Sequence, residues 1–204
     1  MNTLKNNELQ NIRFDWDMIQ DNLHQHLEFG VASGKSLNAQ TRWIHNANPN
    51  QKFNVHGFDT FTGLPEDWVH TDGRLVLSKG DFYSGGETPA IDPDNYARNN
   101  IVFWTGLFSD TIPKYLAQDN SSPIAFLHID CDLYSSTVTV LHSLNHLIVP
   151  GTIIRFDEWV YWWDEENNDH EARAFYEWVE EYNRDYRFFK QNPDNVEEKF
   201  VLII

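Results

Sequence analysis

Two pairs of acidic residues, each placed directly after an apolar segment, are the side chains of this sequence best suited to chemistry. Asp130 and Asp132 follow the apolar run at 123–127, and Asp157 and Glu158 follow the run at 151–156. Apolar runs of this length are typical of buried strands in a parallel sheet. Because the carboxyl ends of such strands form the edge where open α/β sheets bind ligands, we expect the four acids to converge there.

A cluster of carboxylates needs a positive partner. Neighbouring carboxylates raise one another's pKa unless a cation neutralises them. Oxygen ligands suit Mg²⁺, Mn²⁺ or Ca²⁺, whereas zinc favours cysteine and histidine. Any one of these acids, taken singly, is equally well explained as a helix cap that faces water. Two pairs at successive strand ends favour a site for a hard divalent metal.

A glycine-containing turn near the N-terminus predicts a second part of the site. Residues 28–36 contain Gly30 and Gly34 and stand between a predicted strand and a predicted helix. Glycines in such a turn let a ligand approach the backbone at the positive end of the helix dipole. The ending Gly34-Lys35-Ser36 resembles that of a P-loop, but only three residues separate the two glycines, where a P-loop needs four.

Two further strand ends carry candidate contacts for a nucleoside. Asp59 follows the predicted strand at 52–57, and a carboxylate in that position can accept hydrogen bonds from both ribose hydroxyls. A turn-forming aspartate is the alternative. After the predicted strand at 100–104, Gly106 and Leu107 are candidates for the wall of an adenine pocket, with Leu107 or Phe108 stacking on the base. Core packing explains Phe108 equally well.

The order of the segments that position these residues predicts the fold class. We expect strands at 23–29, 52–57, 100–104, 123–127 and 151–156, and a final antiparallel pair at 186–190 and 199–204. Between them we expect a helix that ends near residue 46, a helix that begins at 112–116, a helix at 137–147 and a core-facing helix at 171–182. This alternation predicts an α/β protein with a doubly wound, Rossmann-like, seven-stranded and mostly parallel sheet.

The domain organisation follows from the same pattern. Residues 23–204 are expected to form a single domain, preceded by an N-terminal arm or short helix at 1–22. The connection at 66–93 is long and rich in glycine and proline, so we expect a functional loop there, with a short helix from about residue 94. The aromatic residues at 159–163 fit either core or lid packing or a wall for an acceptor substrate.

Charge and cysteine content exclude several classes of function. The 204 residues carry 31 acidic side chains against 15 Lys and Arg, for a net charge of −16. A nucleic-acid-binding footprint is therefore not expected, and an anionic membrane surface would repel the chain. The single cysteine, Cys131, allows no internal disulfide, and its two acidic neighbours disfavour a reactive thiolate. Without a signal-like or membrane-length apolar segment, a cytoplasmic location is expected.

The segments described above resemble the macrocin O-methyltransferase family (TylF/MycF/NovP type) of the class I S-adenosylmethionine-dependent methyltransferases. The matching segments cover most of residues 24–160 in order, and the block at 129–137 is the most specific of them. The matching segments are 28–36, Phe58-Asp59-Thr60-Phe61 with 63–65, 106–111, Ile129-Asp130-Cys131-Asp132-Leu133-Tyr134-Ser135-Ser136-Thr137 and Phe156-Asp157-Glu158-Trp159.

This resemblance implies the class I methyltransferase fold and a Mg²⁺-assisted methyl transfer from S-adenosylmethionine to a hydroxyl of a sugar or glycoside, as in natural product biosynthesis. It implies that Asp130, Asp157 and Glu158 hold the metal. It also implies that Asp132 is the general base, with Asp130 as the second catalytic residue. The cofactor would be bound by Glu28, Gly30, Val31, Ala32, Ser33, Gly34, Ser36, Asp59, Thr60, Gly106, Leu107 and Asp130.

Two departures from the family pattern and two alternatives are relevant. The family commonly has two aspartates where this chain has Asp157-Glu158, and only about 22 residues precede the first predicted strand. The acceptor can therefore differ from those of the family, and a homo-oligomer is compatible with the resemblance but not implied for this chain.

Asp130-Cys131-Asp132 also fits a metal-dependent glycosyltransferase, although the glycine turn and the second acid pair argue against it. A non-catalytic nucleotide- or metal-binding domain is the other alternative, although every candidate catalytic residue is present.

Overall fold

The computed structural model describes residues 25–47, 52–70, 72–118, 122–159, 169–188 and 198–204. The predicted N-terminal arm at 1–22 lies outside the described residues. Within them, no helix is both long and apolar enough to cross a lipid bilayer.

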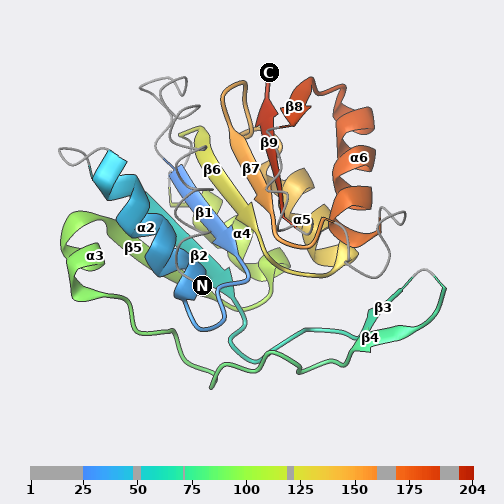
Figure 1. The fold of residues 1–204 in the computed structure, drawn as a ribbon, viewed down its shortest axis with the longest axis horizontal. Coiled ribbons are helices and arrows are strands. Elements are labelled where there is room, and N and C mark those ends of the chain that lie inside the picture. Colours follow the sequence, from blue (N-terminus) through green and yellow to red (C-terminus); the bar gives the residue numbers. More distant parts are fainter. Residues whose placement is uncertain (1–24, 48–51, 71, 119–121, 160–168, 189–197) are drawn as a thin grey trace.

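The predicted seven-stranded, mostly parallel sheet is confirmed. Its strand order is β5-β2-β1-β6-β7-β9-β8, with β9 antiparallel to both of its neighbours and all other pairs parallel (Figure 1). The strands are β1 (Gln25–Phe29), β2 (Asn54–Asp59), β5 (Asn100–Thr105), β6 (Ile124–Ile129), β7 (Ile153–Phe156), β8 (Tyr186–Phe188) and β9 (Lys199–Ile203).

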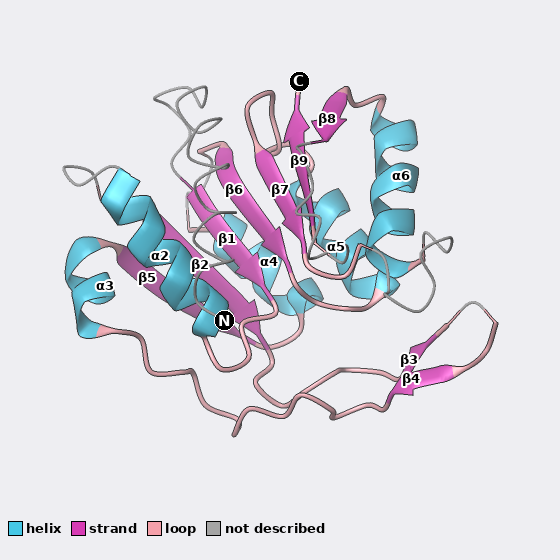
Figure 2. Cartoon of the chain, in the orientation of Figure 1, coloured by secondary structure: helices cyan, strands magenta, loops and turns pink. Residues whose placement is uncertain are grey.

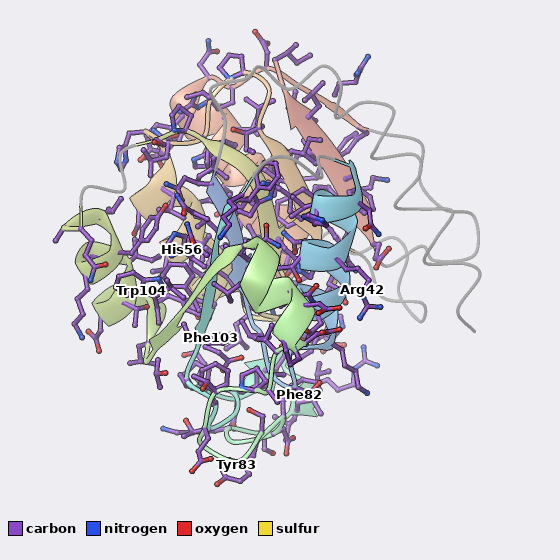
Figure 3. All side chains as sticks on the ribbon, turned by 90° about the vertical axis from the view of Figure 1, so that its left-hand side faces the viewer. Arg42, His56, Phe82, Tyr83, Phe103 and Trp104 are labelled. Carbon is purple, nitrogen blue, oxygen red and sulfur yellow. The ribbon has the colours of Figure 1, made fainter. Side chains whose placement is uncertain are left out.

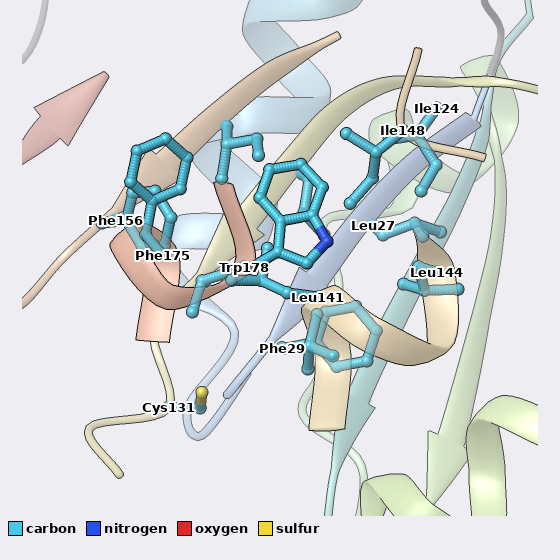
Figure 4. Close-up of a cluster of buried hydrophobic side chains, with 14 of the residues drawn as sticks. Leu27, Phe29, Ile124, Cys131, Leu141, Leu144, Ile148, Phe156, Phe175 and Trp178 are labelled. Carbon is cyan, nitrogen blue, oxygen red and sulfur yellow. The ribbon is translucent and has the colours of Figure 1, made fainter. Parts of the chain in front are cut away.

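Helices cover both faces of this sheet (Figure 2). The α2 face has a core that includes Leu37, Ile44 and Val55. The opposite face, under α4, α5 and α6, has a larger core that includes Phe175 and Trp178 (Figure 4). The helices are α2 (Lys35–Ala47), α3 (Pro93–Arg98), α4 (Phe108–Leu116), α5 (Tyr134–Leu144) and α6 (His170–Tyr182).

Two helices begin earlier than the sequence pattern predicts. The helix expected at 112–116 starts at Phe108, so Pro113 lies inside it rather than in its first turn. The helix expected at 137–147 starts at Tyr134, and Ser135 belongs to its first turn instead of preceding it. Both helices follow a leucine N-cap that makes no side-chain capping bond, so the usual Ser, Thr, Asp or Asn signal is missing.

A hairpin that the sequence did not predict lies in the long connection after β2. Strands β3 (Trp68–Val69) and β4 (Leu75–Leu77) form an antiparallel pair. We call residues 63–86 the arm. It lies beyond the carboxyl ends of the parallel strands (Figure 1). The Trp68 indole N–H donates a hydrogen bond to Nε2 of His170 at 3.1 Å, which attaches the base of the hairpin to the start of α6. The expected short helix near 94 is confirmed as α3.

Candidate active site

A cavity of about 490 Å³ lies at the carboxyl edge of the parallel strands, and it brings most of the predicted site residues together. Its volume is within the range of small-molecule sites. Predicted residues that line it are Gly30, Val31, Ala32, Ser33, Ser36, Asp59, Thr60, Leu107, Asp130, Asp132, Asp157 and Glu158. Three predicted cofactor residues, Glu28, Gly34 and Gly106, do not line it.

The glycine turn packs directly on the loop that carries the first acid pair. Gly30 has φ +89°, a conformation that favours glycine, and its N–H donates to the carbonyl of Phe58 at 3.0 Å. A Cβ at this position would lie 1.6 Å from the carbonyl oxygen of Asp130. The two halves of the predicted site are therefore in backbone contact, and only glycine fits between them.

Asp59 fixes the glycine turn through two backbone hydrogen bonds and its own loop through a third. Its Oδ2 accepts from the N–H groups of Val31 at 2.8 Å and Ala32 at 2.7 Å. Its Oδ1 accepts from the N–H of Phe61 at 2.7 Å. An ionised carboxylate has about four acceptor positions, so these bonds leave Oδ1 room for one further donor. Asp59 thus shapes the turn and still faces the cavity.

Glu28 acts from beneath the turn and is fully buried. Its Oε1 accepts a hydrogen bond from the Ser36 hydroxyl at 2.7 Å, which ties the start of α2 to β1. Its Oε2 lies 3.2 Å from Nδ1 of His128 on the neighbouring strand β6. Glu28 therefore supports the floor of the site and makes no contact with the cavity.

Below the acids lies a row of polar side chains that the sequence reasoning missed. In the register of the sheet, Glu28 pairs with His128, and His128 pairs with Arg155. The Nε2 of His128 lies 3.8 Å from both Asp130 Oδ2 and Asp157 Oδ1. Burial and Arg155 lower the pKa of His128, but the hydrogen bonds that its ring donates to Asp157 and Glu28 outweigh them and raise it to about 9.

A signal for this row exists in the sequence. Alternate strand residues share a face, so His128 stands on the face of Asp130, and Arg155 on the face of Asp157.

Arg155 supplies a positive charge that the sequence analysis had assigned to a metal. Its guanidinium donates to Asp157 Oδ1 at 2.6 Å and also pairs with the buried Glu198. Arg155 lines the cavity next to the acids. The protein therefore neutralises part of the acid cluster with its own side chain.

The first acid pair nevertheless retains an excess of negative charge. Burial is the main cause that raises the pKa of Asp130 to about 7; His128 opposes this effect and Asp157 adds to it. Burial and then repulsion from Asp130 raise the pKa of Asp132 to about 7. Asp132 also has φ +63° and stands at the centre of a three-residue turn, closed by a 2.6 Å bond from the Leu133 N–H to the Cys131 carbonyl.

Only two of the three predicted metal ligands belong to the group of closely spaced ligand atoms in the described residues. One ligand atom from each of His128, Asp130 and Asp157 forms a group whose members lie within 4.8 Å of one another, and Glu158 is not part of it. Glu158 lines the same cavity, but its Oε2 is buried, and no described residue forms a hydrogen bond with that oxygen. The orphaned oxygen and the raised aspartate pKa values fit a bound cation.

The arm contributes an outer wall that the sequence did not assign. Phe82 lines the cavity from a left-handed backbone conformation, with φ +64°, and it is 57% exposed. Phe82 and its exposed neighbour Tyr83 lie below α3 in Figure 3. Of the aromatic residues at 159–163, Trp159 is buried in the core against Phe175, and the others lie outside the described residues.

Comparisons with known proteins agree with this architecture. The solved structure of the calicheamicin methyltransferase CalS11 matches with a TM-score of 0.73 and 24% identity, over 96% of this chain and 78% of that one. The O-methyltransferase NovP matches with a TM-score of 0.63 and 20% identity, over 96% and 78%. A structure of CmcI with Mg and SAM matches with a TM-score of 0.55 and 13% identity, over 97% and 70%. At these identities the likeness shows the fold.

A search among curated proteins finds no match. Among protein families, residues 27–159 match the one described as "Methyltransferase domain". This segment runs from β1 to the second acid pair, so it contains the glycine turn, Asp59 and all four acids of the cavity. Because the match covers more than half of the sequence, the chain belongs to the methyltransferase-domain family.

Proposed function

We propose that this protein is an S-adenosylmethionine-dependent O-methyltransferase that acts on a hydroxyl of a sugar or of a sugar-containing small molecule. The observation that carries the proposal is the composition of the cavity, with the glycine turn and Asp59 on one side and buried carboxylates on the other. The acceptor class is supported by two fold neighbours, CalS11, a TDP-rhamnose 3′-O-methyltransferase, and the O-methyltransferase NovP.

The residues of the glycine turn would hold the cofactor in this proposal. The backbone at Gly30 would hold its methionine part, and Asp59 Oδ1 would accept a hydrogen bond from one ribose hydroxyl. Leu107, which is 45% exposed at the cavity, would form an apolar wall for the adenine. The acceptor enters from the side of Phe82 and the acids.

Asp132 is the general base. A carboxyl with a pKa of about 7 is suited to take a proton near neutral pH. Bound S-adenosylmethionine would supply an electrophilic methyl group, and its carbon–sulfur bond would break with the electron pair left on sulfur as the new carbon–oxygen bond forms. Asp132 would take the hydroxyl proton. Because this displacement needs oxygen, carbon and sulfur in line, much of the acceleration comes from alignment.

A hard divalent cation, Mg²⁺ in the first place, fits the remaining charge of the site. Asp130 and Asp157 would hold it, with Glu158 as the third oxygen donor of the same cavity. When bound, the cation supplies orientation of the acceptor hydroxyls and a lower pKa for the attacking one. The CmcI structure with Mg and SAM supports this assignment.

Calorimetric titration of S-adenosylhomocysteine, with Mg²⁺ and again with EDTA, tests the cofactor assignment. Binding under both conditions is expected, because the turn and Asp59 bind the cofactor and the metal belongs to the acceptor side. Binding of UDP in place of S-adenosylhomocysteine would refute methyl transfer and favour the glycosyltransferase alternative. A screen of nucleotide sugars and glycosides with labelled S-adenosylmethionine then tests the acceptor class.

A further inference from the structure

Glu171 is a buried carboxyl that has no part in the roles described above. It stands in the first turn of α6 and has an exposed fraction of 0%. A buried acid is costly unless its oxygens are satisfied. Here each oxygen accepts one backbone hydrogen bond, Oε1 from the Cys131 N–H at 3.4 Å and Oε2 from the Glu158 N–H at 3.1 Å.

Both backbone donors belong to the acid loops. Cys131 stands between the two aspartates after β6, and Glu158 follows Asp157 after β7. The last backbone hydrogen bond between these two segments runs from the Asp157 N–H to the Ile129 carbonyl, at 3.0 Å. Beyond it, no backbone hydrogen bond joins the described parts of the two loops. Past that bond, the side chain of Glu171 bridges the loops after β6 and β7.

The position of Glu171 is itself fixed from outside the cavity. The Asp169 side chain accepts from the His170 N–H at 2.9 Å and caps α6. His170 has φ +50° and accepts the hydrogen bond from Trp68 at the base of the arm. Glu171 is therefore held on a rigid helix start while it binds the two loops, which is what the support of a precise site requires.

We propose that Glu171 is a positioning residue that sets the distance between the two acid loops, and thereby the affinity of the site for a divalent cation. This inference rests on the proposed function, because it concerns the metal half of that site. Residues that orient metal ligands through hydrogen bonds change metal affinity by about 10–100-fold when they are removed. No described hydrogen bond joins Glu171 to Gly30 or Asp59, so we expect the affinity of the cofactor half to stay at the parent value.

The variant Glu171→Gln tests the inference, because it replaces one acceptor oxygen with an NH₂ group that faces a backbone N–H. Glu180→Gln is the matched control, since it makes the same change at an exposed position of the same helix. The probes are Mn²⁺, titrated by electron paramagnetic resonance, and S-adenosylhomocysteine, titrated by calorimetry. We expect Glu171→Gln to weaken Mn²⁺ binding at least about tenfold and to keep the parent affinity for S-adenosylhomocysteine.

The outcomes separate the inference from the proposed function. Unchanged Mn²⁺ affinity in Glu171→Gln, with a parent that binds Mn²⁺, overturns the inference alone. Equal losses of both ligands assign Glu171 a general structural role and also overturn it. A parent that binds S-adenosylhomocysteine but not Mn²⁺ refutes the metal site, and the inference with it.

If Glu171→Gln does not fold, Glu171→Asp takes its place. That side chain keeps both oxygens but is shorter by one methylene. We expect the same selective loss of Mn²⁺ affinity, and unchanged affinity would again overturn the inference.

Discussion

Asp132 combines burial, a strained backbone and a pKa near neutrality in one residue. It is 8% exposed, has φ +63°, and titrates at about 7 because burial and the neighbouring Asp130 disfavour its charged form. Left-handed conformations cost non-glycine residues on the order of 1–3 kcal/mol and concentrate at functional sites. At the residue scale, this strain is consistent with a side chain held in place for proton transfer.

We expect Asp132→Asn to slow methyl transfer strongly while leaving cofactor binding intact. Asparagine tolerates the left-handed conformation and keeps the shape of the side chain, so only proton acceptance is lost. Loss of a general base lowers kcat by about 10²–10⁴-fold. The measurement is single-turnover transfer from labelled S-adenosylmethionine, with the exposed Asp185→Asn as control. Parent-like turnover in Asp132→Asn would remove it from the mechanism.

Asp59→Ala should weaken the binding of S-adenosylhomocysteine by at least about tenfold, because the glycine turn loses two charge-assisted hydrogen bonds. The free energy of unfolding should fall as well, by about 1–3 kcal/mol, since three backbone N–H groups lose their acceptor. Calorimetry and thermal melting measure the two effects. Mn²⁺ affinity should stay at the parent value. Parent-like affinity for S-adenosylhomocysteine would show that Asp59 has no role in cofactor binding.

The residues that could be predicted from the sequence are those at strand ends. Asp130, Asp132, Asp157 and Glu158 stand where apolar runs stop, and that position alone places them at one edge. His128 and Arg155 lie inside the strands β6 and β7, where a polar residue looks like an exception in an apolar segment. In the sequence, Glu171 looks the same as the exposed glutamates of its amphipathic helix. Its contacts depend on how α6 crosses the loops, which a single sequence does not contain.

At the scale of elements, the contact between the glycine turn and the loop after β6 is the tightest in the site. Gly30→Ala would place a methyl group against the Asp130 carbonyl, at a distance no backbone tolerates without a shift. We expect it to abolish binding of S-adenosylhomocysteine and to lower the melting temperature.

Gly73→Ala provides the matched control, because Gly73 has φ +85° but no atom within 4 Å of an added Cβ. That variant carries only the conformational cost, about 1–2 kcal/mol. Calorimetry and thermal melting of both variants separate the conformational cost of a positive φ, which both substitutions carry, from the steric clash with Asp130, which only Gly30→Ala carries. Equal effects of the two substitutions would contradict the importance of the contact.

The hairpin of the arm could not be predicted from sequence patterns. Its strands have two and three residues, too few for an alternation to be recognised. What fixes the hairpin is a distant contact, because Trp68 and His170 are separated by 102 positions. The mostly parallel sheet, in contrast, could be predicted because its apolar segments are long enough to be recognised as buried strands and alternate with helical segments.

At the scale of the whole molecule, the acid cluster makes stability depend on pH in a definite direction. Asp130 and Asp132 have a pKa of about 7 in the folded chain and a reference value of 3.8, so between these values the folded state holds more protons than the unfolded state. Stability therefore falls as the pH rises through that window. His128, raised from 6.5 to about 9, acts in the same direction, since its contribution is present below 6.5 and lost through 9.

We therefore expect the melting temperature in EDTA to fall between about pH 5.5 and about pH 8.5. The groups that face Asp130 and Asp132 are the acids Asp157, Glu28 and Asp59 and the bases His128 and Arg155, so the acids outnumber the cations. Mg²⁺ competes with protons for the carboxylates and should raise the melting temperature more at the higher pH. Scanning calorimetry at both pH values, with and without Mg²⁺, measures this.

Because the net charge of −16 also destabilises the protein as the pH rises, Asp132→Asn serves as the reference, with a shallower slope expected. A Mg²⁺ effect that is equal at both pH values would contradict the assignment of the cation to these carboxylates.

The burial of Cys131 makes the protein convenient for spectroscopy. It is the only cysteine of the chain, it is 6% exposed, and burial together with Glu171 raises the pKa of its thiol well above the ordinary value. Thiol reagents react with the thiolate, so this side chain stays unmodified in the folded protein. A cysteine introduced at Tyr83, which is 66% exposed beside the cavity wall, is then the single site for a fluorophore or spin label. A label at this position would report whether the environment of the arm changes on ligand binding, in an otherwise unaltered chain.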